Sequence, residues 1–273
     1  MPQTINTNNA SINAQRNLSA SQASLTTSMQ RLSSGLRINS AKDDAAGLAI
    51  AERMNSLVRG TNVAIRNAND AISLTQTAEG AVSKIGDMLQ RMRELAVQSA
   101  NATNTTDDRA NLHAEFEQMA QEVTRTALNT KFNGQAVIGS QAGGLDYQVG
   151  ANSIDQVRVT TSNVATITST VTTGNITSAP NASSAMANID TALNAINVER
   201  ALYGAVQNRF EAVIATLQIS AENTAAAKGR IVDADFAVET ANLSRAQILQ
   251  QAGSAMLAQA NQLPQQVLQL LRG

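Results

Sequence analysis

The 273-residue chain carries 20 Lys and Arg residues against 21 Asp and Glu residues, has 2% aromatic residues and contains no cysteine. Its near-neutral charge, without a cluster of basic residues, argues against a nucleic-acid partner. The missing cysteines exclude disulfides, thiolate catalysis and cysteine-bound zinc, and no cofactor is expected. Because large aromatic rings supply much of the buried area of globular cores, the abundant helix formers favour long, thin helices instead.

No run of eighteen apolar residues predicts a membrane span, so membrane insertion is not expected. Residues 1–18 have neither the basic start nor the apolar core of a cleaved signal peptide. If the chain is exported, we therefore expect export without such a peptide.

Apolar residues of the first segment recur at alternating steps of three and four, the spacing of a coiled-coil seam. They are Leu18, Leu25, Met29, Leu32 and Leu36, with polar Gln22 at one weak position. A break at residues 35–40 follows, and its Ser40 is a candidate N-cap for the next helix. Asp43 and Asp44 would then offset the positive end of that helix, an interpretation favoured over a separate charged site.

A second helix is expected from about residue 47 to 99, roughly 75 Å long at 1.5 Å per residue, so another helix must cover its apolar seam. The Asn- and Thr-rich loop 101–108 ends in Asp107 and Asp108, which can cap a third helix. That helix carries Leu112, Phe116, Met119 and Val123 and is expected to fold back on the second.

From about residue 129 to 179 the composition changes to Gly, Thr, Val and Ser. The alternation at 157–159 and the turn signals Asn133-Gly134 and Gly143-Gly144 predict a small β region. Helical periodicity returns at Met186 and continues to Leu217. A last helix carries apolar residues up to Leu270, and Pro264 is expected to kink it.

Both ends of the chain are nearly uncharged. Residues 1–30 contain only Arg16, and residues 244–273 contain only Arg245 and Arg272 as charged groups. Since a helix exposed to water normally carries more charge, these ends are expected to be buried among other helices in an assembly. They bury little area alone, so we expect them to be disordered in the free subunit.

The run LSSGLRINSAKDDAAGLAI at residues 32–50 resembles bacterial flagellin. Further flagellin-like runs follow in the family's order, at 90–101, 131–134, 148–152, 230–235 and 267–272. The resemblance covers essentially the whole chain outside roughly 153–185. It implies a short form of flagellin without the large variable outer domains.

The resemblance implies a mainly α fold, an elongated coiled-coil and helical-bundle rod with a small β-hairpin region. Residues 1–44 together with 233–273 would form an inner coiled-coil domain from both termini. Residues 45–180 together with 181–232 would form a rod domain, with the β region at about 130–180.

The implied function is structural rather than enzymatic: a subunit exported unfolded by the flagellar type III apparatus, which polymerises into the extracellular filament used for swimming. The implied partners are further copies of the chain, the hook-filament junction protein, the filament cap protein and a flagellin export chaperone. Two rival interpretations are the junction protein itself and a soluble binding module that uses the β region.

Two sets of residues are carried over from the family by position. The first matches positions that contact Toll-like receptor five in flagellins sensed by animals, or alternatively pack between subunits: Gln90, Arg91, Leu95, Gln98 and Glu115. The second resembles the terminal segment read by inflammasome sensors and covered by the export chaperone, with seam packing as the alternative: Val267, Leu268, Leu270, Leu271 and Arg272. Gly273 after Arg272 departs from the usual ending.

The seam of the inner coiled coil is expected to comprise Leu25, Met29, Leu32, Leu249, Met256 and Leu263. His113-Ala114-Glu115 matches the start of a zinc-deaminase signature, but the Cys pair that would complete the site is missing. His113 is therefore expected to be a solvated helix residue.

Overall fold

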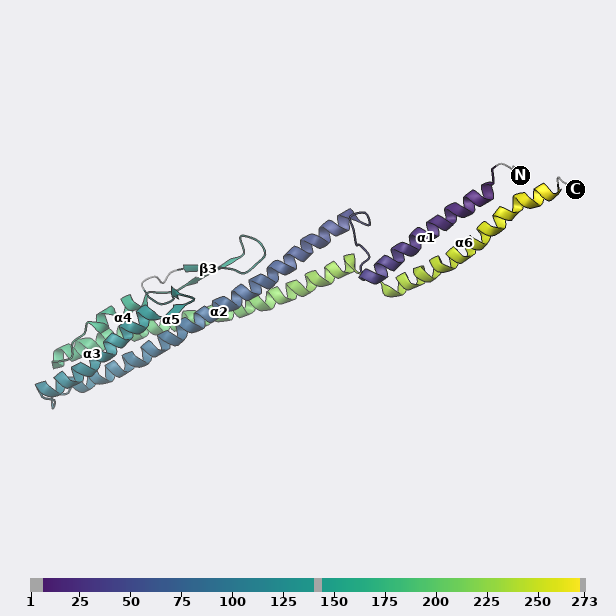
Figure 1. Cartoon of the computed structure of the whole chain (residues 1–273). Helices are drawn as coiled ribbons and strands as arrows, with labels where there is room; N and C mark the ends of the chain where they lie inside the picture. The colour runs from purple at the N-terminus through teal and green to yellow at the C-terminus, as the bar shows by residue number, and fades with distance from the viewer. Residues whose placement is uncertain (1–6, 140–143, 271–273) are drawn as a thin grey trace. The chain divides into compact units, whose positions relative to one another are not determined.

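A computed structural model describes residues 7–139 and 144–270, with side chains described as far as residue 262. These residues form the helices α1 (Asn9–Ser34), α2 (Ala45–Ala100), α3 (Thr106–Asn129), α4 (Val164–Thr172), α5 (Ala179–Val232) and α6 (Phe236–Leu270) (Figure 1). Two antiparallel strand pairs join β1 (Lys131–Phe132) to β2 (Gln135–Ala136) and β3 (Gly144–Gln148) to β4 (Gln156–Thr160). The prediction of a mainly α-helical fold with a small β region is confirmed. No described helix is long and apolar enough to cross a membrane.

The chain divides into two compact units. The terminal unit comprises Met1–Ser56 with Asn223–Gly273, and the central unit comprises Leu57–Glu222. Both divisions fall inside long helices, α2 and α5. The terminal unit thus contains the segments predicted for the inner domain and, in addition, the start of α2 and the end of α5.

Helix α1 ends where the sequence predicted a break. Gly35 adopts φ 71°, and its N–H donates to the Arg31 carbonyl at 2.8 Å. Glycine populates this left-handed region at little cost, so the helix stops there. The next residues pair with the end of α5, since Arg37 N–H donates to the Val232 carbonyl at 2.6 Å and Leu36 bridges Asp233. This pairing joins the two halves of the chain inside the terminal unit.

The start of α2 corrects the predicted cap. Asp44, not Ser40, caps the helix, because its Oδ1 accepts from Gly47 N–H at 2.9 Å. Ser40 instead donates from its N–H and Oγ to Asp43 Oδ2, at 2.9 and 3.1 Å. Hydrogen bonds from the backbone N–H groups of Asn39 and then Ser40 lower the pKa of Asp43. The Asp44 carboxylate accepts a hydrogen bond from a free N–H group in the first turn of α2, the role predicted for the Ser40 hydroxyl.

The long second helix is confirmed, and the third helix is capped by Thr105 together with the predicted Asp108. Thr105 is the N-cap of α3: its Oγ1 accepts from Asp108 N–H at 3.2 Å, and Asp108 Oδ2 accepts from Thr105 N–H at 2.9 Å. This reciprocal arrangement is a capping box. The hydrogen bond from the Thr105 hydroxyl is the main cause of the lowered pKa of Asp108.

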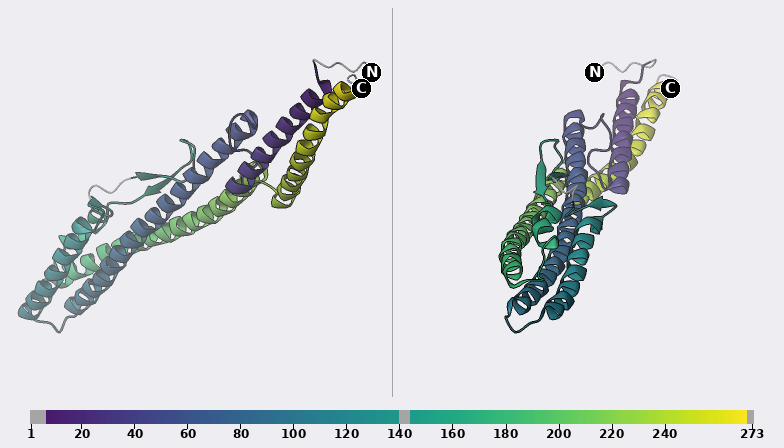
Figure 2. Two further views of the ribbon diagram at one scale, coloured as in Figure 1. Left: turned by 45° about the vertical axis from the view of Figure 1, so that its right-hand side comes forward. Right: turned by 90° about the vertical axis from the view of Figure 1, so that its left-hand side faces the viewer.

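The core of the central unit lies along α2, where α3, α4 and α5 cover it (Figures 1 and 2). Its largest fully buried side chains include Ile85, Leu89, Met92, Leu95, Phe116, Ile189, Ile196 and Tyr203. Arg91 on α2 pairs with Glu115 on α3, and Arg93 on α2 pairs with Asp190 on α5. Farther along, Gln207 donates to Glu79 at 2.7 Å. On α3, Arg109 Nε donates to the Ser99 carbonyl of α2 at 2.9 Å. Both α3 and α5 therefore run antiparallel to α2 and in the same direction as each other.

The strands pack on one side of the long helices. In the β3–β4 hairpin, Leu145 faces Val159 and Tyr147 faces Val157, and Val157 and Val159 join Ala68, Ala71 and Phe210 in a second core cluster. The shorter β1–β2 hairpin turns at Asn133 and Gly134, both with positive φ, as the sequence predicted.

The second half of the predicted β region is wrong. Residues 164–172 form α4, capped by the Asn163 side chain, and α5 begins at Ala179 rather than near Met186. The Val and Thr residues of α4 favour strands locally. However, Val164, Thr168 and Val171 are buried at helical spacing, so packing overrides this propensity.

Alkaline pH should destabilise the central unit through Tyr203. Burial, followed by the nearby Glu199 carboxylate, raises the pKa of this phenol to about 12, whereas it titrates near 10 in an unfolded chain. Between about pH 10 and 12 the folded state binds more protons, so stability present below pH 10 is lost as pH rises. Melting of wild type and Tyr203→Phe should therefore diverge above pH 10.

The Tyr203 hydroxyl is buried, and the Ser162 backbone acts on its pKa in the opposite direction to burial. The Phe variant removes only this hydroxyl, so its stability should lie within about 1.5 kcal/mol of wild type at pH 7. Burial and then Asp70 also raise the pKa of Tyr147, so its alkaline contribution has the same sign and is measured separately with Tyr147→Phe. An alkaline melting profile of Tyr203→Phe identical to that of wild type would contradict the assignment.

Candidate assembly and recognition surfaces

The two terminal helices form an antiparallel pair (Figures 1 and 2). At one end Asn8 Nδ2 donates to the Ala260 carbonyl at 2.7 Å, and at the other Arg31 Nη1 lies 3.9 Å from Glu239 Oε2. Residues from the two ends of the sequence thus build one structure.

The contact between α1 and α6 alternates large and small residues. On α1, the buried and partly buried positions at heptad spacing are Ser11, Ala14, Leu18, Ser21, Leu25, Ser28 and Leu32. On α6 they are Glu239, Leu243, Ala246, Gln250, Gly253, Leu257 and Ala260. A Cβ on Gly253 would lie 3.3 Å from Leu18 Cδ1. The absence of a side chain at Gly253 therefore leaves room for the side chain of Leu18.

This contact corrects the predicted seam. Leu25 and Leu32 are partly buried as expected, but Met29 is 57% exposed, Leu249 50% and Met256 64%. The side chain of Leu263 lies outside the described residues. The prediction followed the largest apolar side chains, whereas the helices meet along an adjacent row of smaller residues, which permits a closer approach.

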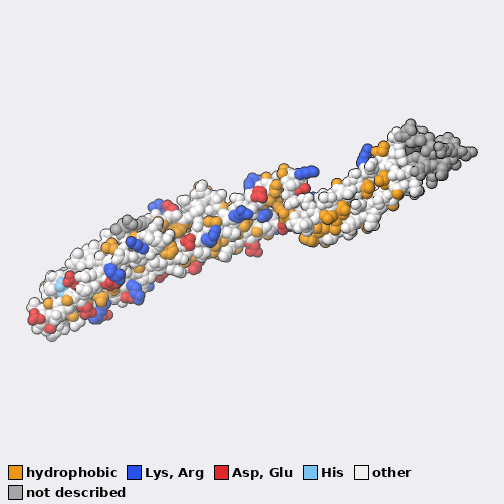
Figure 3. All heavy atoms as spheres, viewed as in Figure 1, with side chains coloured by type: hydrophobic (Ala, Val, Ile, Leu, Met, Phe, Trp, Pro, Cys, Tyr) orange, Lys and Arg blue, Asp and Glu red, His pale blue; other side chains and the backbone are white. Residues whose placement is uncertain are grey.

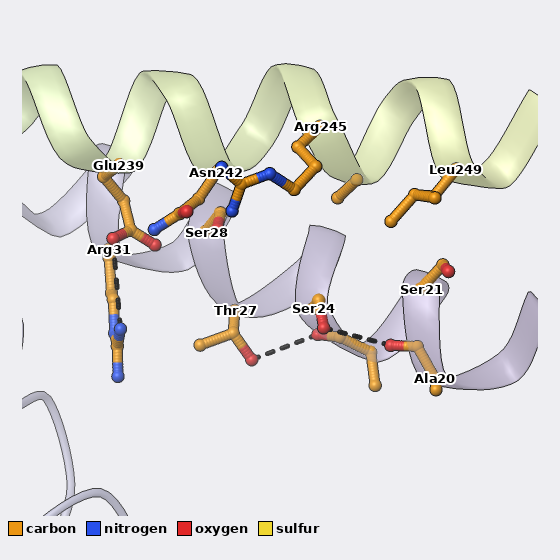
Figure 4. A pocket seen from close by; sticks show the side chains of 12 residues that line it. Ala20, Ser21, Ser24, Thr27, Ser28, Arg31, Glu239, Asn242, Arg245 and Leu249 are labelled. Carbon is orange, nitrogen blue, oxygen red and sulfur yellow. Dashed lines mark hydrogen bonds and ion pairs between the residues drawn. The ribbon is translucent and has the colours of Figure 1, made fainter. Parts of the chain in front are cut away.

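A groove of about 540 Å³ lies between α1 and α6 (Figure 4). Its walls carry hydroxyl and amide groups together with Arg31, Glu239 and Arg245. The hydroxyls of Ser24 and Thr27 donate to carbonyls one turn earlier in α1, each at 3.1 Å. These two hydroxyls already have hydrogen-bond partners, so another helix can cover them without leaving them unpaired.

The terminal unit also exposes large apolar side chains. They are Ile12, Met29, Ile50, Phe236, Val238, Ile248, Leu249 and Met256, and orange patches mark apolar side chains along this unit in the face shown in Figure 3. Monomeric soluble proteins rarely expose such a concentration of apolar groups, so this surface is suited to burial against other chains.

The first set carried over from the family lies on α2 and α3. Arg91 Nη2 lies 2.8 Å from Glu115 Oε1, and its Nη1 lies 2.8 Å from Glu94 Oε2. These hydrogen bonds, with that of Glu115 the stronger, raise the pKa of Arg91. Gln90 and Gln98 are exposed. The structure therefore brings four of the five residues to one accessible region.

Leu95 departs from that set. It is 1% exposed and belongs to the core beneath α3 and α5. The helical spacing predicted that Leu95 lies near Gln98 on the surface. In the structure, Leu95 lies on the buried face of α2 together with Met92 and Ser99. Its side chain is not available at the surface of this chain.

Two further residues differ from expectation or lie beyond description. His113 is partly buried, with a buried Nδ1 lacking a partner among the described residues, and its ring centroid lies 6.3 Å from that of Phe116; it is not a solvated residue. Val267, Leu268 and Leu270 lie in α6 with undescribed side chains, and Leu271 and Arg272 lie outside the described residues.

These features are those of a structural subunit built from long helices with apolar side chains on their outward faces. Within the described ranges, no group of three His, Cys, Asp or Glu side chains gathers as a metal site would require. The surfaces described above are suited to packing against other helices and to forming ion pairs.

Comparison with known proteins gives the family. Residues 5–142 match the bacterial flagellin N-terminal helical region and residues 186–271 match the bacterial flagellin C-terminal helical region. A flagellin of Halalkalibacterium halodurans is 47% identical over 98% of this chain and 99% of its own length. A flagellin of Bacillus subtilis is 39% identical over the same shares of the two chains. The chain belongs to the bacterial flagellin family.

Solved structures agree. The Bacillus cereus flagellin crystal structure is similar with 32% identity and a TM-score of 0.52, covering 60% of this chain and 94% of that one. A putative flagellar hook-associated protein from Vibrio parahaemolyticus has a TM-score of 0.60 at 11% identity, covering 70% of this chain and 100% of that one, which shows a shared fold alone. The family and these flagellin relatives are structural proteins, and the chain is not an enzyme.

Proposed function

We propose that this chain is the repeating subunit of a bacterial flagellar filament outside the cell, and that its terminal unit drives polymerisation. The observation that carries the proposal is the exposed apolar surface of α1 and α6, in chain ends with almost no charge. Burying this surface against the same unit of other copies removes apolar area from water.

Each copy would use different faces to contact its neighbours. Such heterologous contacts continue into an open helical filament when the rotation between copies does not close a ring. The satisfied hydroxyls in the groove beside Arg31 and Arg245 favour this packing, because covering them costs little hydrogen bonding.

Export and the remaining partners follow from family membership as proposals. The subunit would pass unfolded through the flagellar type III apparatus, helped by a flagellin export chaperone, and fold beneath the filament cap protein. The hook-filament junction protein would bind the first subunits. The terminal helices would gain their order in the filament, because in the free subunit they bury little area against the entropy of the chain.

Seeded polymerisation tests the function. Purified full-length chain, added to short filament seeds and viewed by electron microscopy, should give long thin filaments, whereas a truncation lacking residues 244–273 should remain unpolymerised. Circular dichroism and melting of the truncation should show the central unit still folded. Persistent monomers from both proteins would favour the junction protein or a binding module.

A second candidate function is recognition of the free subunit by Toll-like receptor five. The favouring observation is the accessible region formed by Gln90, Arg91, Gln98 and Glu115, in which Arg91 is held by two carboxylates. Arg91→Asp removes the positive group and places three acidic groups together, so receptor signalling should fall about tenfold or more.

Arg125→Asp is the matched control for this reporter assay, since Arg125 is also exposed and ion-paired, to Glu122 on its own helix. It should signal as wild type does. Equal signalling by Arg91→Asp and wild type would remove receptor recognition through this region.

The end of the chain is proposed to bind the export chaperone and inflammasome sensors through Val267, Leu268, Leu270, Leu271 and Arg272. A double alanine replacement at Leu270 and Leu271 should weaken chaperone binding in calorimetry. Unchanged affinity would contradict the assignment.

A further inference from the structure

The sulfur of this chain belongs entirely to methionine. The sequence contains eight methionines and has neither cysteine nor tryptophan. A methionine thioether accepts an oxygen atom from a peroxide, and in a chain without thiols it is the side chain most open to this reaction. The exposure of each methionine therefore decides where peroxide modifies the protein.

Two of the described methionines are exposed, and both lie on the terminal helices. Met29 on α1 is 57% exposed and Met256 on α6 is 64% exposed. The other described methionines are buried or partly buried: Met54, Met88, Met92, Met119 and Met186. All of these except Met54 belong to the core of the central unit or pack against it. A peroxide in water therefore reaches Met29 and Met256 without any opening of the fold.

Both exposed methionines are part of the apolar surface of the terminal unit. Leu249 precedes Met256 by seven residues on α6 and is itself 50% exposed, so the two side chains share one row of the helix. On α1, Leu25 and Leu32 are partly buried, whereas Met29 remains outside their contact with α6. No charged residue lies three or four positions from either methionine. Each methionine therefore belongs to a surface suited to apolar contacts with another chain.

Oxidation would change these two side chains from apolar to polar. The thioether sulfur attacks one oxygen of hydrogen peroxide, the O–O bond breaks, and the departing hydroxide takes the proton of the transferred oxygen to form water. The sulfur loses two electrons and the peroxide gains them, so the products are methionine sulfoxide and water. The sulfoxide oxygen accepts hydrogen bonds, and burying it among apolar groups would leave it unpaired. A surface that carries the sulfoxide is therefore less suited to burial.

We propose that Met29 and Met256 are the sites at which peroxide modifies the free subunit, and that their sulfoxides keep the subunit out of the filament. Burial of the same side chains in a finished filament then shields them from the reaction. This inference rests on the proposed filament function, because the apolar surface of α1 and α6 must become buried there. It holds whether or not the terminal helices are ordered in the free subunit, since water reaches both methionines in either case.

Peptide mass spectrometry after brief treatment with hydrogen peroxide maps the sites. In the free subunit, Met29 and Met256 should gain oxygen at least about tenfold faster than Met92, which must wait for an opening of the core. In filaments grown from untreated subunit, the oxidation of Met29 and Met256 should slow about tenfold or more. Met92 is the internal control, because it is buried within the central unit itself and its rate should not rise on polymerisation.

Leucine replacements test the consequence for assembly. The double variant Met29→Leu, Met256→Leu keeps apolar side chains of similar volume but has no thioether at either site, so it should extend seeds at the wild-type rate before and after peroxide. Peroxide-treated wild-type chain should elongate about tenfold more slowly, and the two methionine sulfoxide reductases, one for each epimer, should restore its rate. The matched control Met119→Leu, Met186→Leu retains both exposed methionines and should stay sensitive. Melting of each treated chain shows whether the central unit remains folded.

Each result decides the proposal. Three outcomes would overturn it and leave the filament function standing: oxidation of Met92 as fast as that of Met256, normal elongation by treated wild-type chain, or loss of elongation in the treated Met29→Leu, Met256→Leu variant. A treated wild-type chain whose central unit no longer melts cooperatively would also overturn it, because elongation would then be lost through unfolding. Equal oxidation of Met29 in filaments and in free subunit would contradict the shielding. Failure of untreated wild-type chain to extend seeds would overturn the filament function and this proposal together.

Discussion

Replacing Leu95 by alanine will lower the unfolding free energy of the central unit by about 2 to 5 kcal/mol, the range for removing a large buried aliphatic side chain. Leu95 is 1% exposed in a cluster that includes Met92, Phe116 and Ile189. Its loss leaves a cavity between helices that are long and cannot easily close upon it. Urea unfolding of the free subunit, followed by circular dichroism, measures the change.

The matched control is Leu202→Ala, a leucine on α5 of the same unit that is 40% exposed. It should cost less than about 1 kcal/mol in the free subunit, since little buried area is lost. If Leu95→Ala instead unfolds like wild type and abolishes receptor signalling, the leucine belongs to a recognition surface and its burial in the core is wrong.

Gly253→Leu will abolish filament formation while leaving the melting of the central unit unchanged. A Cβ added at this position would lie 3.3 Å from Leu18 Cδ1 and 3.8 Å from Leu18 Cα, so the rest of a leucine side chain would enter the volume of α1. The α1–α6 pair must separate to accept it, and overpacking of this kind costs typically 1 to 3 kcal/mol. Seeded elongation followed by light scattering measures the loss.

Ser254→Leu controls for the added apolar group, because Ser254 is exposed on the adjacent position of α6. If the loss in Gly253→Leu comes from the α1–α6 contact and not from the added side chain itself, Ser254→Leu should elongate seeds at a rate within about twofold of wild type. Normal filaments from Gly253→Leu would mean that the closeness of the two helices has no part in assembly.

Much of the fold could be predicted from the sequence because long helices repeat their signals many times. The apolar periodicity of α2 and α3 and the glycine at residue 35 each gave the right element in the right place. The errors lie where the signal is short or weak. The Val- and Thr-rich α4 has the composition of a strand, but Val164, Thr168 and Val171 are buried at helical spacing and Asn163 caps the segment as a helix.

The candidate surfaces were harder to predict. The spacing of Leu25 and Leu32 correctly indicated that α1 pairs with another helix. The predicted contact also included Met29, Leu249 and Met256, which lie on a different row of the helices and are exposed. Serines, alanines and Gly253 make the actual contact, and small residues carry little hydrophobic signal. The cue that could have found them is the repeat of small residues every seven positions at Ala14, Ser21 and Ser28. Leu95 shows the converse limit, since helical spacing alone does not say which face of a helix is inside.

The hydroxyls of α1 bear on how a polymer of this chain would bend. Several of these hydroxyls each donate a hydrogen bond to the carbonyl one turn earlier in the same helix, namely those of Ser21, Ser24, Thr26 and Thr27. These hydroxyls therefore need no hydrogen-bond acceptor on a neighbouring chain. Contacts made across such a surface depend on shape rather than on directional bonds. Adjacent helices could therefore slide a short distance along one another at little energetic cost, and a tube lined with them would flex without rupture.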